Sequence, residues 1–276
     1  MSLPTRFVKM AGGGNDFLLF EADGRKLSAQ EKRQIALLCR RGLSVGADGA
    51  LFLSGGSDGQ VHLDYFNADG GLAAFCANGT RCAARYAVRR GLVAGQEPVL
   101  VTGWGPIPAH VDGEEVTLHL QPLPLPGDPI SIRGEGLPSR ATPMHVGVPH
   151  LVLFVDGDLS GVDVARLAPP LRNHPSLPEG ANVDFVQILE RDRIRVRTYE
   201  RGVERETLAC GSGVVASAVV AARQRRVQTP VACGTKSGVD FTVTFEEENG
   251  MLVDATLTGD AREIFSAELT EDAWRA

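Results

Sequence analysis

The chain has 276 residues, which is long enough for two modest domains that each bury a core. Hydrophobic residues make up 43% and charged residues 22%, as in an ordinary globular protein, and the formal net charge is −6. Because no basic patch stands out and no apolar run reaches membrane-spanning length, neither nucleic acid nor a membrane is expected as a partner. The five cysteines are odd in number and irregularly spaced, which argues against a secreted disulfide framework and favours a cytoplasmic protein with reduced thiols.

The first half of the chain predicts strands around two helices. Apolar runs predict strands over residues 17–20, 50–53, 61–66, 99–102 and 116–120. The helical spacing of Ile35, Leu38 and Cys39 predicts a helix over residues 28–43, with Ser28 as its N-cap. A second helix is predicted over residues 78–90, with cations near its C-terminal end and Gly91 as its stop.

The second half repeats this order after a stretch rich in proline and glycine, residues 121–143, which is the expected boundary. Strands are predicted over residues 150–155, 183–189, 193–199, 239–246 and 251–257, and a helix over residues 212–223. The prediction is an α+β protein of two pseudo-symmetric homologous domains, 1–121 and 122–261. Each domain is expected to be a strand-rich, barrel-like sheet wrapped around a central helix.

The two halves are related by a shift of 134 residues, which is close to half the chain. Cys76-Ala77-Asn78-Gly79 opens one apolar stretch, and Cys210-Gly211-Ser212-Gly213 opens another. The same shift aligns Met10 with Met144, Gly13 with Gly147, Phe20 with Phe154, Gly46-Ala47-Asp48 with Gly180-Ala181-Asn182, and Tyr65 with Tyr199. One shift that aligns several separate segments indicates two homologous halves, each with one cysteine at the start of one helix.

Both cysteine motifs place a sulfur beside the first turn of a predicted helix. Asn78 and Ser212 are good N-cap residues. The first turn of a helix offers unpaired N–H groups and a partial positive charge, which together can hold a carboxylate. The same field lowers the pKa of a cysteine placed there, so a thiolate is expected near neutral pH.

Two such thiols, facing each other across a pseudo-two-fold axis, suit a racemase or epimerase that needs no cofactor. Inverting an amino-acid stereocentre requires a base that removes the α-proton from one face and an acid that delivers a proton to the other face. One cysteine would be the thiolate base and the other the thiol acid, and their roles would swap in the reverse direction. The helix N-termini would stabilise the charge that grows on the carboxylate as the carbanion forms.

Taken singly, each cysteine has an ordinary explanation, since a lone cysteine in an apolar stretch is usually a packing residue. The matched positions of Cys76 and Cys210 favour catalysis instead. Cys39, Cys82 and Cys233 have no cysteine at the 134-residue shift and are assigned to packing. A dithiol redox pair remains an alternative from a different class, although redox motifs usually have Cys-x-x-Cys spacing. No cysteine or histidine spacing resembles a zinc site, so no metal is expected.

At these motifs the chain resembles the diaminopimelate epimerase family, along nearly its whole length. The matching blocks are Lys9-Met10-Ala11-Gly12-Gly13-Gly14-Asn15-Asp16-Phe17, Phe66-Asn67-Ala68-Asp69-Gly70, Cys76-Ala77-Asn78-Gly79-Thr80-Arg81-Cys82, Gly147-Val148-Pro149-His150, Ala181-Asn182, Tyr199-Glu200-Arg201-Gly202 and Glu206-Thr207-Leu208-Ala209-Cys210-Gly211-Ser212-Gly213. The resemblance implies a cofactor-independent enzyme that interconverts LL- and meso-diaminopimelate for lysine and cell-wall synthesis. It also implies that residues 262–276 complete the first domain, and that the protein is a homodimer.

The resemblance assigns roles to individual residues. Cys76 and Cys210 would be the acid/base pair, and His150 would sit beside the reacting centre. The residues that would bind this small amino-acid substrate are Asn15, Asn67, Ala77, Asn78, Asn182, Glu200, Arg201, Gly211 and Ser212. An arginine with asparagine amides suits a second, distal carboxylate. At the 134-residue shift Asn67 falls opposite Arg201 and Asp16 opposite His150, so the halves would diverge where the two ends of the substrate differ.

Several of these residues also have plain structural explanations. Asn15, Asn67 and Asn182 stand near glycine or aspartate, as turn residues do. The chain departs from the family pattern at Val148, where many members have an asparagine that contacts the distal end of the substrate, and at Ala77, which replaces the usual glycine but keeps the N–H. A racemase of another amino acid, such as histidine or proline, on the same scaffold therefore stays open.

Overall fold

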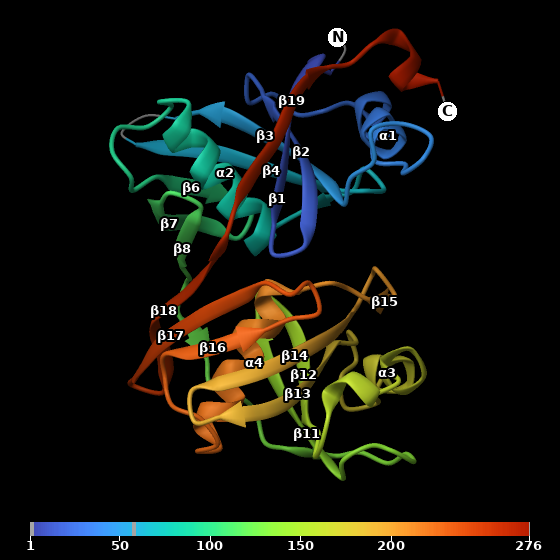
Figure 1. The fold of residues 1–276 in the computed structure, drawn as a ribbon, viewed down its shortest axis with the longest axis vertical. Coiled ribbons are helices and arrows are strands. Elements are labelled where there is room, and N and C mark those ends of the chain that lie inside the picture. The colour runs from blue at the N-terminus through green and yellow to red at the C-terminus, as the bar shows by residue number, and fades with distance from the viewer. Residues whose placement is uncertain (1–2, 57–58, 276) are drawn as a thin grey trace. The chain divides into compact units, whose positions relative to one another are not determined.

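The computed structural model of the protein describes residues 3–56 and 59–275. The chain divides into two compact units: unit 1 consists of Met1–Leu118 and Gly259–Ala276, and unit 2 consists of His119–Thr258. Figure 1 shows that each unit is a strand-rich body with its own helices. In the described ranges, no helix combines the length and the apolar character that a membrane span requires.

Unit 1 contains two α-helices, α1 (Ala29–Leu38) and α2 (Ala77–Arg89), and ends in the 3-10 helix η2 (Glu271–Trp274). Its strands are β1 (Arg6–Gly12), β2 (Asn15–Glu21), β3 (Gly49–Gly55), β4 (Gln60–Asn67), β5 (Leu72–Ala73), β6 (Val99–Thr102), β7 (Gly105–Asp112), β8 (Glu115–His119) and β19 (Arg262–Glu268). β1 pairs antiparallel with β2 and β19, β2 pairs parallel with β3, β3 pairs antiparallel with β4, and β4 pairs parallel with β6. A strand from the C-terminal end of the chain is therefore part of the sheet of unit 1.

Helix α2 lies inside this sheet. It contacts β1, β2, β3, β4, β6, β7 and β19, and every residue from Ala77 to Ala87 is buried. Ala83, Ala84 and Ala87 are fully buried, and their small side chains let the strands approach the helix closely.

Unit 2 contains α3 (Val164–Arg172), α4 (Gly211–Arg223) and the 3-10 helix η1 (Leu159–Gly161). Its strands are β9 (Leu123–Pro124), β10 (Ile130–Ser131), β11 (Arg140–Val146), β12 (Val148–Phe154), β13 (Asn182–Glu190), β14 (Arg193–Glu200), β15 (Arg205–Glu206), β16 (Val231–Gly234), β17 (Asp240–Glu248) and β18 (Met251–Asp260). The pairings from β11 to β16 repeat those from β1 to β6, and α4 contacts β11, β12, β13, β14, β16 and β17. The predicted fold class is confirmed, since each unit wraps a mixed sheet around one central helix.

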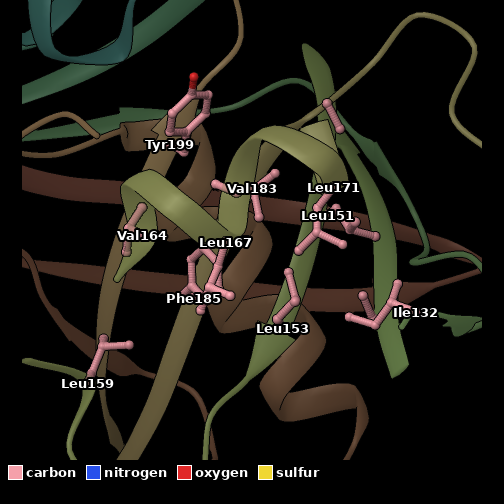
Figure 2. Close-up of a cluster of buried hydrophobic side chains, with 13 residues drawn as sticks. Ile132, Leu151, Leu153, Leu159, Val164, Leu167, Leu171, Val183, Phe185 and Tyr199 are labelled. Carbon is pink, nitrogen blue, oxygen red and sulfur yellow. The ribbon is translucent and has the colours of Figure 1, made fainter. Parts of the chain in front are cut away.

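In unit 2 the sheet has one face toward α3 and one toward α4. Figure 2 shows Val164, Leu167 and Leu171 of α3 packed against side chains of three strands: Leu151, Leu153, Val183, Phe185 and Tyr199. Side chains alternate between the two faces of a strand. The intervening residues His150, Asp184 and Thr198 therefore point to the face that α4 covers.

Unit 1 has the same arrangement at a shift that differs by one residue. Leu18, Phe20, Ala50, Phe52 and Phe66 pack with α1, as Leu151, Leu153, Val183, Phe185 and Tyr199 pack with α3. These pairs are 133 residues apart, whereas the two cysteines are 134 apart. The β1–β2 hairpin turns on Gly13 and Gly14, but the β11–β12 hairpin turns on Gly147 alone, so unit 2 loses one residue there.

The alignment of several strand residues at a shift of 134 is therefore wrong. In the structure Phe17 matches His150, and Asn67 matches Glu200, in place of the predicted Asp16–His150 and Asn67–Arg201 pairs. The error has a simple cause. An alignment that is one residue off pairs side chains that lie on opposite faces of a strand.

Among the α-helices and the strands longer than three residues, the sequence did not predict α3 or the strands β1, β7, β11, β16 and β19. Helix α3 carries Pro169 and Pro170 in its interior, which reads as a break in the sequence, and β11 begins inside the predicted boundary stretch. Helix α1 ends at Leu38 and is therefore shorter than the predicted helix 28–43. The predicted N-cap is confirmed, since Ser28 caps α1 in a capping box with Glu31.

Candidate active site

Each central helix begins directly after a cysteine. Cys76 and Cys210 are the N-cap residues of α2 and α4, with extended backbones at φ −144°, ψ 108° and φ −124°, ψ 111°. Their carbonyls accept the first helical hydrogen bonds, from the N–H of Thr80 at 2.8 Å and of Val214 at 2.9 Å. Because the first N–H groups of a helix have no partner within it, each unit presents hydrogen-bond donors beside a cysteine.

Asn78 and Ser212 are the second residues of these helices, so their prediction as N-caps is wrong. The cysteine before them takes the N-cap place because its carbonyl already accepts the first helical bond. Their side chains instead join polar networks, one in each unit.

In unit 1 the network fixes the amide of Asn15. Its Nδ2 donates to Oδ2 of Asp48 at 2.8 Å, and its Oδ1 accepts from Nδ2 of Asn78 at 2.8 Å. Oδ1 of Asn78 in turn accepts from the buried guanidinium of Arg81 at 2.6 Å. Two predicted substrate-binding residues, Asn15 and Asn78, are thus directly joined beside the start of α2.

A second carboxylate braces this network. Asp16 forms an ion pair with Lys9 at 2.7 Å and another with Arg41, which also contacts Asp48 at 2.9 Å. Burial opposes ionisation of Asp16, but the hydrogen bonds from Arg41 and Lys9 outweigh it and hold the pKa of Asp16 below its usual range.

In unit 2 the network is a buried chain that reaches Cys210. Nδ1 of His150 lies 2.7 Å from Oδ2 of Asp184, and Nε2 of His150 lies 2.9 Å from Oγ of Ser212. Oγ of Ser212 lies 3.4 Å from Sγ of Cys210. The other oxygen of Asp184 accepts from the hydroxyl of Thr198 at 2.7 Å. The side chains of His150 and Asp184 are both fully buried.

The expected lowering of the cysteine pKa is wrong for Cys210. Burial raises the pKa of its thiol well above the ordinary value, and the negative charges of Glu200 and Asp184 raise it further. The Ser212 hydroxyl and the Gly213 N–H favour the thiolate but do not outweigh burial. Unit 2 therefore holds Cys210 as the neutral thiol at neutral pH.

The other predicted binding residues of unit 2 lie together. Oδ1 of Asn182 accepts from the backbone N–H of Arg201 at 2.8 Å, and Nδ2 of Asn182 lies 3.4 Å from Nε2 of His150. Nη1 of Arg201 donates to the carbonyl of Glu179 at 2.8 Å, and Glu200 accepts from the hydroxyl of Thr207 at 2.6 Å.

The remaining predicted residues lie at other points. Asn67 is exposed at the end of β4, where its N–H donates to the carbonyl of Gly71 at 2.9 Å in a turn. Ala77 and Gly211 are the first residues of α2 and α4, where a backbone N–H is available. Val148, which departs from the family pattern, is half-buried at the start of β12.

The three cysteines assigned to packing are buried. Burial raises the pKa of the Cys39 and Cys82 thiols to about 12, and it also raises the pKa of Cys233. Within residues 3–56 and 59–275, no cluster of three or more histidine, cysteine or acidic side chains could hold a metal ion.

Sequence reasoning missed Asp48, Asp184 and Thr198. One signal could have found Asp184, because a charged residue in the otherwise apolar run Val183-Asp184-Phe185-Val186 is unusual unless it has a buried partner. Asp48 and Thr198 carry no such signal, since their neighbours in the sequence are mixed.

Comparison with known proteins identifies a family across the chain. The family model described as Diaminopimelate epimerase matches residues 7–120 and 143–263. A diaminopimelate epimerase of Aquifex aeolicus is 36% identical over 280 residues, covering 96% of this chain and 98% of the relative. One of Archaeoglobus fulgidus is 37% identical over 280 residues, covering 95% of each chain.

Solved structures share the fold at much lower identity. A probable proline racemase from Agrobacterium radiobacter K84 aligns with a TM-score of 0.74 at 15% identity, over 98% of this chain and 94% of that chain. A hydroxyproline epimerase from Agrobacterium vitis aligns with a TM-score of 0.66 at 17% identity, over 97% and 92%. These likenesses concern the fold, whereas the sequence matches cover nearly the whole chain at much higher identity. The chain therefore belongs to the diaminopimelate epimerase family and is an isomerase.

Proposed function

We propose that this protein interconverts LL- and meso-2,6-diaminopimelate by proton transfer between a thiolate, the α-carbon and a thiol. One observation carries the proposal: Cys76 and Cys210 occupy the same N-cap position on the central helices of two homologous units. The family of the chain supports diaminopimelate as the substrate, and the product serves lysine and peptidoglycan precursor synthesis.

The two cysteines divide the acid and base roles. The thiolate removes the α-proton from one face, and the electron pair of the broken C–H bond stays on the α-carbon and spreads into the carboxylate. The opposite thiol then delivers its proton to the other face, which forms the new C–H bond. Because Cys210 is held as the thiol, it is the acid when the cycle starts and the base when the cycle runs in reverse.

The helix starts hold the α-carboxylate. The backbone N–H groups of Ala77, Asn78, Gly211 and Ser212 belong to the first turns of α2 and α4, where the helix dipole favours negative charge. Such donors stabilise the carboxylate more as its charge grows in the transition state, which lowers the barrier to proton removal.

The distal end of the substrate carries a second ammonium and carboxylate. The Arg201 guanidinium, with five N–H donors, suits the carboxylate, and the Glu200 carboxylate suits the ammonium. Asn182 supports Arg201 through the hydrogen bond to its backbone N–H. Asn15 and Asn67 complete this set of polar contacts, and His150 supports the reacting centre.

The proposal extends to assembly and location. In this proposal units 1 and 2 are the two catalytic domains. The sequence predicts residues 1–121 with 262–276 for the first domain and residues 122–261 for the second. The protein works in the cytoplasm without metal or organic cofactor, as a homodimer. The half-exposed Ile264 and Phe265 of β19 supply apolar surface for a second copy. Light scattering coupled to size-exclusion chromatography should give twice the 29.4 kDa chain mass, and a monomeric mass would contradict the dimer.

The first experiment measures α-proton exchange by NMR. Reduced protein is incubated in deuterated buffer with LL-diaminopimelate, and separately with histidine, proline, glutamate and aspartate. Deuterium should enter diaminopimelate alone, with meso product appearing, and epimerisation should be lost in Cys76→Ala and Cys210→Ala. Cys39→Ala is the control that keeps activity. Exchange in another amino acid would assign the protein to that racemase activity, and exchange in none would exclude the thiol acid/base reaction.

A further inference from the structure

The buried polar chain of unit 2 stands where unit 1 has two apolar side chains and a tyrosine. The 133-residue shift matches Phe17 to His150, Leu51 to Asp184, and Tyr65 to Thr198. In unit 1, a Cβ on Gly79 would lie 2.9 Å from Cδ2 of Leu51, so α2 packs on an apolar side chain. In unit 2, the equivalent Gly213 of α4 packs on the carboxylate of Asp184. The fold therefore does not require a carboxylate at this position, because the matching unit is built with leucine.

The directions of the hydrogen bonds in this chain follow from the groups at its two ends. The Asp184 carboxylate can only accept, so Nδ1 of His150 carries the hydrogen. Oδ1 of Asn182 accepts from the backbone N–H of Arg201, which turns its amide Nδ2 toward Nε2 of His150. Nε2 therefore has the lone pair, and it accepts the hydroxyl hydrogen of Ser212.

The last link reaches the thiol. With its hydrogen given to His150, the Ser212 oxygen has lone pairs for the S–H of Cys210, 3.4 Å away. The donors thus run in the order Cys210 to Ser212 to His150, with Asp184 as the final acceptor, and all three hydrogens point away from the sulfur.

We propose that Asp184 is a positioning residue that, through His150 and Ser212, holds a path along which the proton of Cys210 leaves and returns. This inference rests on the proposed acid/base role of Cys210. It concerns unit 2 alone, since unit 1 has Phe17, Leu51 and Tyr65 at the matching positions.

The proton balance of this step is closed. The S–H proton passes to Oγ of Ser212 while the Ser212 hydroxyl proton passes to Nε2 of His150. The products are a Cys210 thiolate, an unchanged Ser212 hydroxyl and a His150 imidazolium that faces the Asp184 carboxylate. The same two transfers in reverse restore the thiol. The charged groups that face these atoms are Glu200 and Asp184 at Cys210, and Asp184 at His150.

Asp184 fits this role because its carboxylate is buried and accepts two hydrogen bonds. A buried carboxylate is costly unless hydrogen bonds compensate it, and Asp184 accepts from both His150 and Thr198. The carboxylate fixes the His150 tautomer and stabilises the imidazolium, whereas an uncharged side chain of the same shape would do neither.

The test compares Asp184→Asn, Ser212→Ala and the double variant with wild type. The control is Ser217→Ala, a buried α4 hydroxyl that lies outside the chain. We expect kcat for LL-diaminopimelate to fall about 100-fold in each single variant, with KM changed much less, because the path serves proton transfer and not binding. The double variant should lose no more than the worse single variant, since both interrupt one path. Additive losses would overturn the proposal.

A second readout does not depend on turnover. In protein with 15N-labelled histidine, the NMR signals of the His150 ring should show the Nδ1–H tautomer in wild type and in Ser217→Ala. Asp184→Asn should shift the ring toward the Nε2–H form. Retention of the Nδ1–H form together with full kcat in Asp184→Asn would overturn the proposal.

The two proposals fail in different ways. If wild type does not epimerise diaminopimelate, the proposed function is wrong, while the NMR result still reports on the Asp184–His150 pair. If Asp184→Asn does not fold, Ser212→Ala and Ser212→Thr decide. The threonine variant keeps the hydroxyl, so its kcat should fall much less than that of the alanine variant, and equal kcat in these two variants would overturn the path.

Discussion

Gly213 of α4 lies directly against the Asp184 carboxylate of β13. A Cβ on Gly213 would stand 3.2 Å from Cγ of Asp184 and 2.9 Å from Oγ1 of Thr198, so only glycine allows this approach. In unit 1 a Cβ on Gly79 would stand 2.9 Å from Cδ2 of Leu51, which is also closer than real Cβ contacts. The glycine that ends each Cys-x-x-Gly motif thus lets the helix start come close to the sheet, most tightly at Gly213.

Gly213→Ala should destabilise the protein and reduce activity. The added methyl group must push α4 away from Asp184, which costs about 1–3 kcal/mol as other overpacked cores do. Urea denaturation measures the free energy of unfolding, and Gly161→Ala is the matched control because its Cβ would meet open space. Equal unfolding free energies in the two variants would contradict the close approach.

Cys210 should react with alkylating agents only at high pH. The thiolate is the reactive form, and burial together with the carboxylates of Glu200 and Asp184 raises the pKa of Cys210. The rate of carbamidomethylation at Cys210, followed by mass spectrometry of its peptide, should keep rising above pH 9. The pKa of an activated cysteine is lowered, whereas that of Cys210 is raised. A reaction rate that reaches a plateau below pH 8 would therefore show that the thiolate is already formed and would contradict this prediction.

Asp48→Ala should weaken substrate binding more than turnover. Asp48 accepts from the amide of Asn15, and without it Asn15 loses the partner that fixes its orientation. Losing a hydrogen bond to a charged group costs about 1.5–3 kcal/mol, so KM for diaminopimelate should rise about 10-fold or more while kcat changes little. Asp64→Ala, at an exposed residue of β4, is the control. An unchanged KM would show that the orientation of the Asn15 amide does not affect substrate binding.

Glu31→Gln should reduce stability at neutral pH but not in acid. Hydrogen bonds from Arg25, then from the backbone and hydroxyl of Ser28, lower the pKa of Glu31 from 4.5 to about 2. A lowered pKa stabilises the folded protein above the unfolded value, and this stability is lost as pH falls from 4.5 toward 2. The Tm of the variant should therefore lie below that of wild type at pH 7, and the gap should narrow across that range. A constant gap, or one matched by Glu248→Gln at an exposed site, would contradict this assignment.

The sequence located the two central helices well because their signals are local. The predicted helices 78–90 and 212–223 correspond to α2 and α4, and each cysteine stands at a helix start as expected. The N-cap assignment failed at Asn78 and Ser212 because it weighed side-chain preference, whereas the backbone of the preceding cysteine decides where the helix begins.

The polar environment of Cys210 could not be predicted from local sequence patterns. Thr198 and Asp184 are 14 residues apart in the sequence and meet because β13 and β14 pair in register. His150 joins them from β12 through a parallel pairing that places it beside Asn182. No sequence periodicity contains these pairings, so neither the chain to Cys210 nor its raised pKa was predicted.

The sequence by itself determined that the protein has two homologous halves, each with a cysteine at the start of a helix rich in small residues. Repeats and helix starts are patterns of residues close together in the sequence, so they can be recognised without the tertiary structure. Only the tertiary structure decided which strand residues of the two units correspond, because the hairpin at Gly147 is one residue shorter and changes the shift of the strands that follow from 134 to 133. At this shift Asp184 matches Leu51, so α4 packs on a buried carboxylate where α2 packs on a leucine.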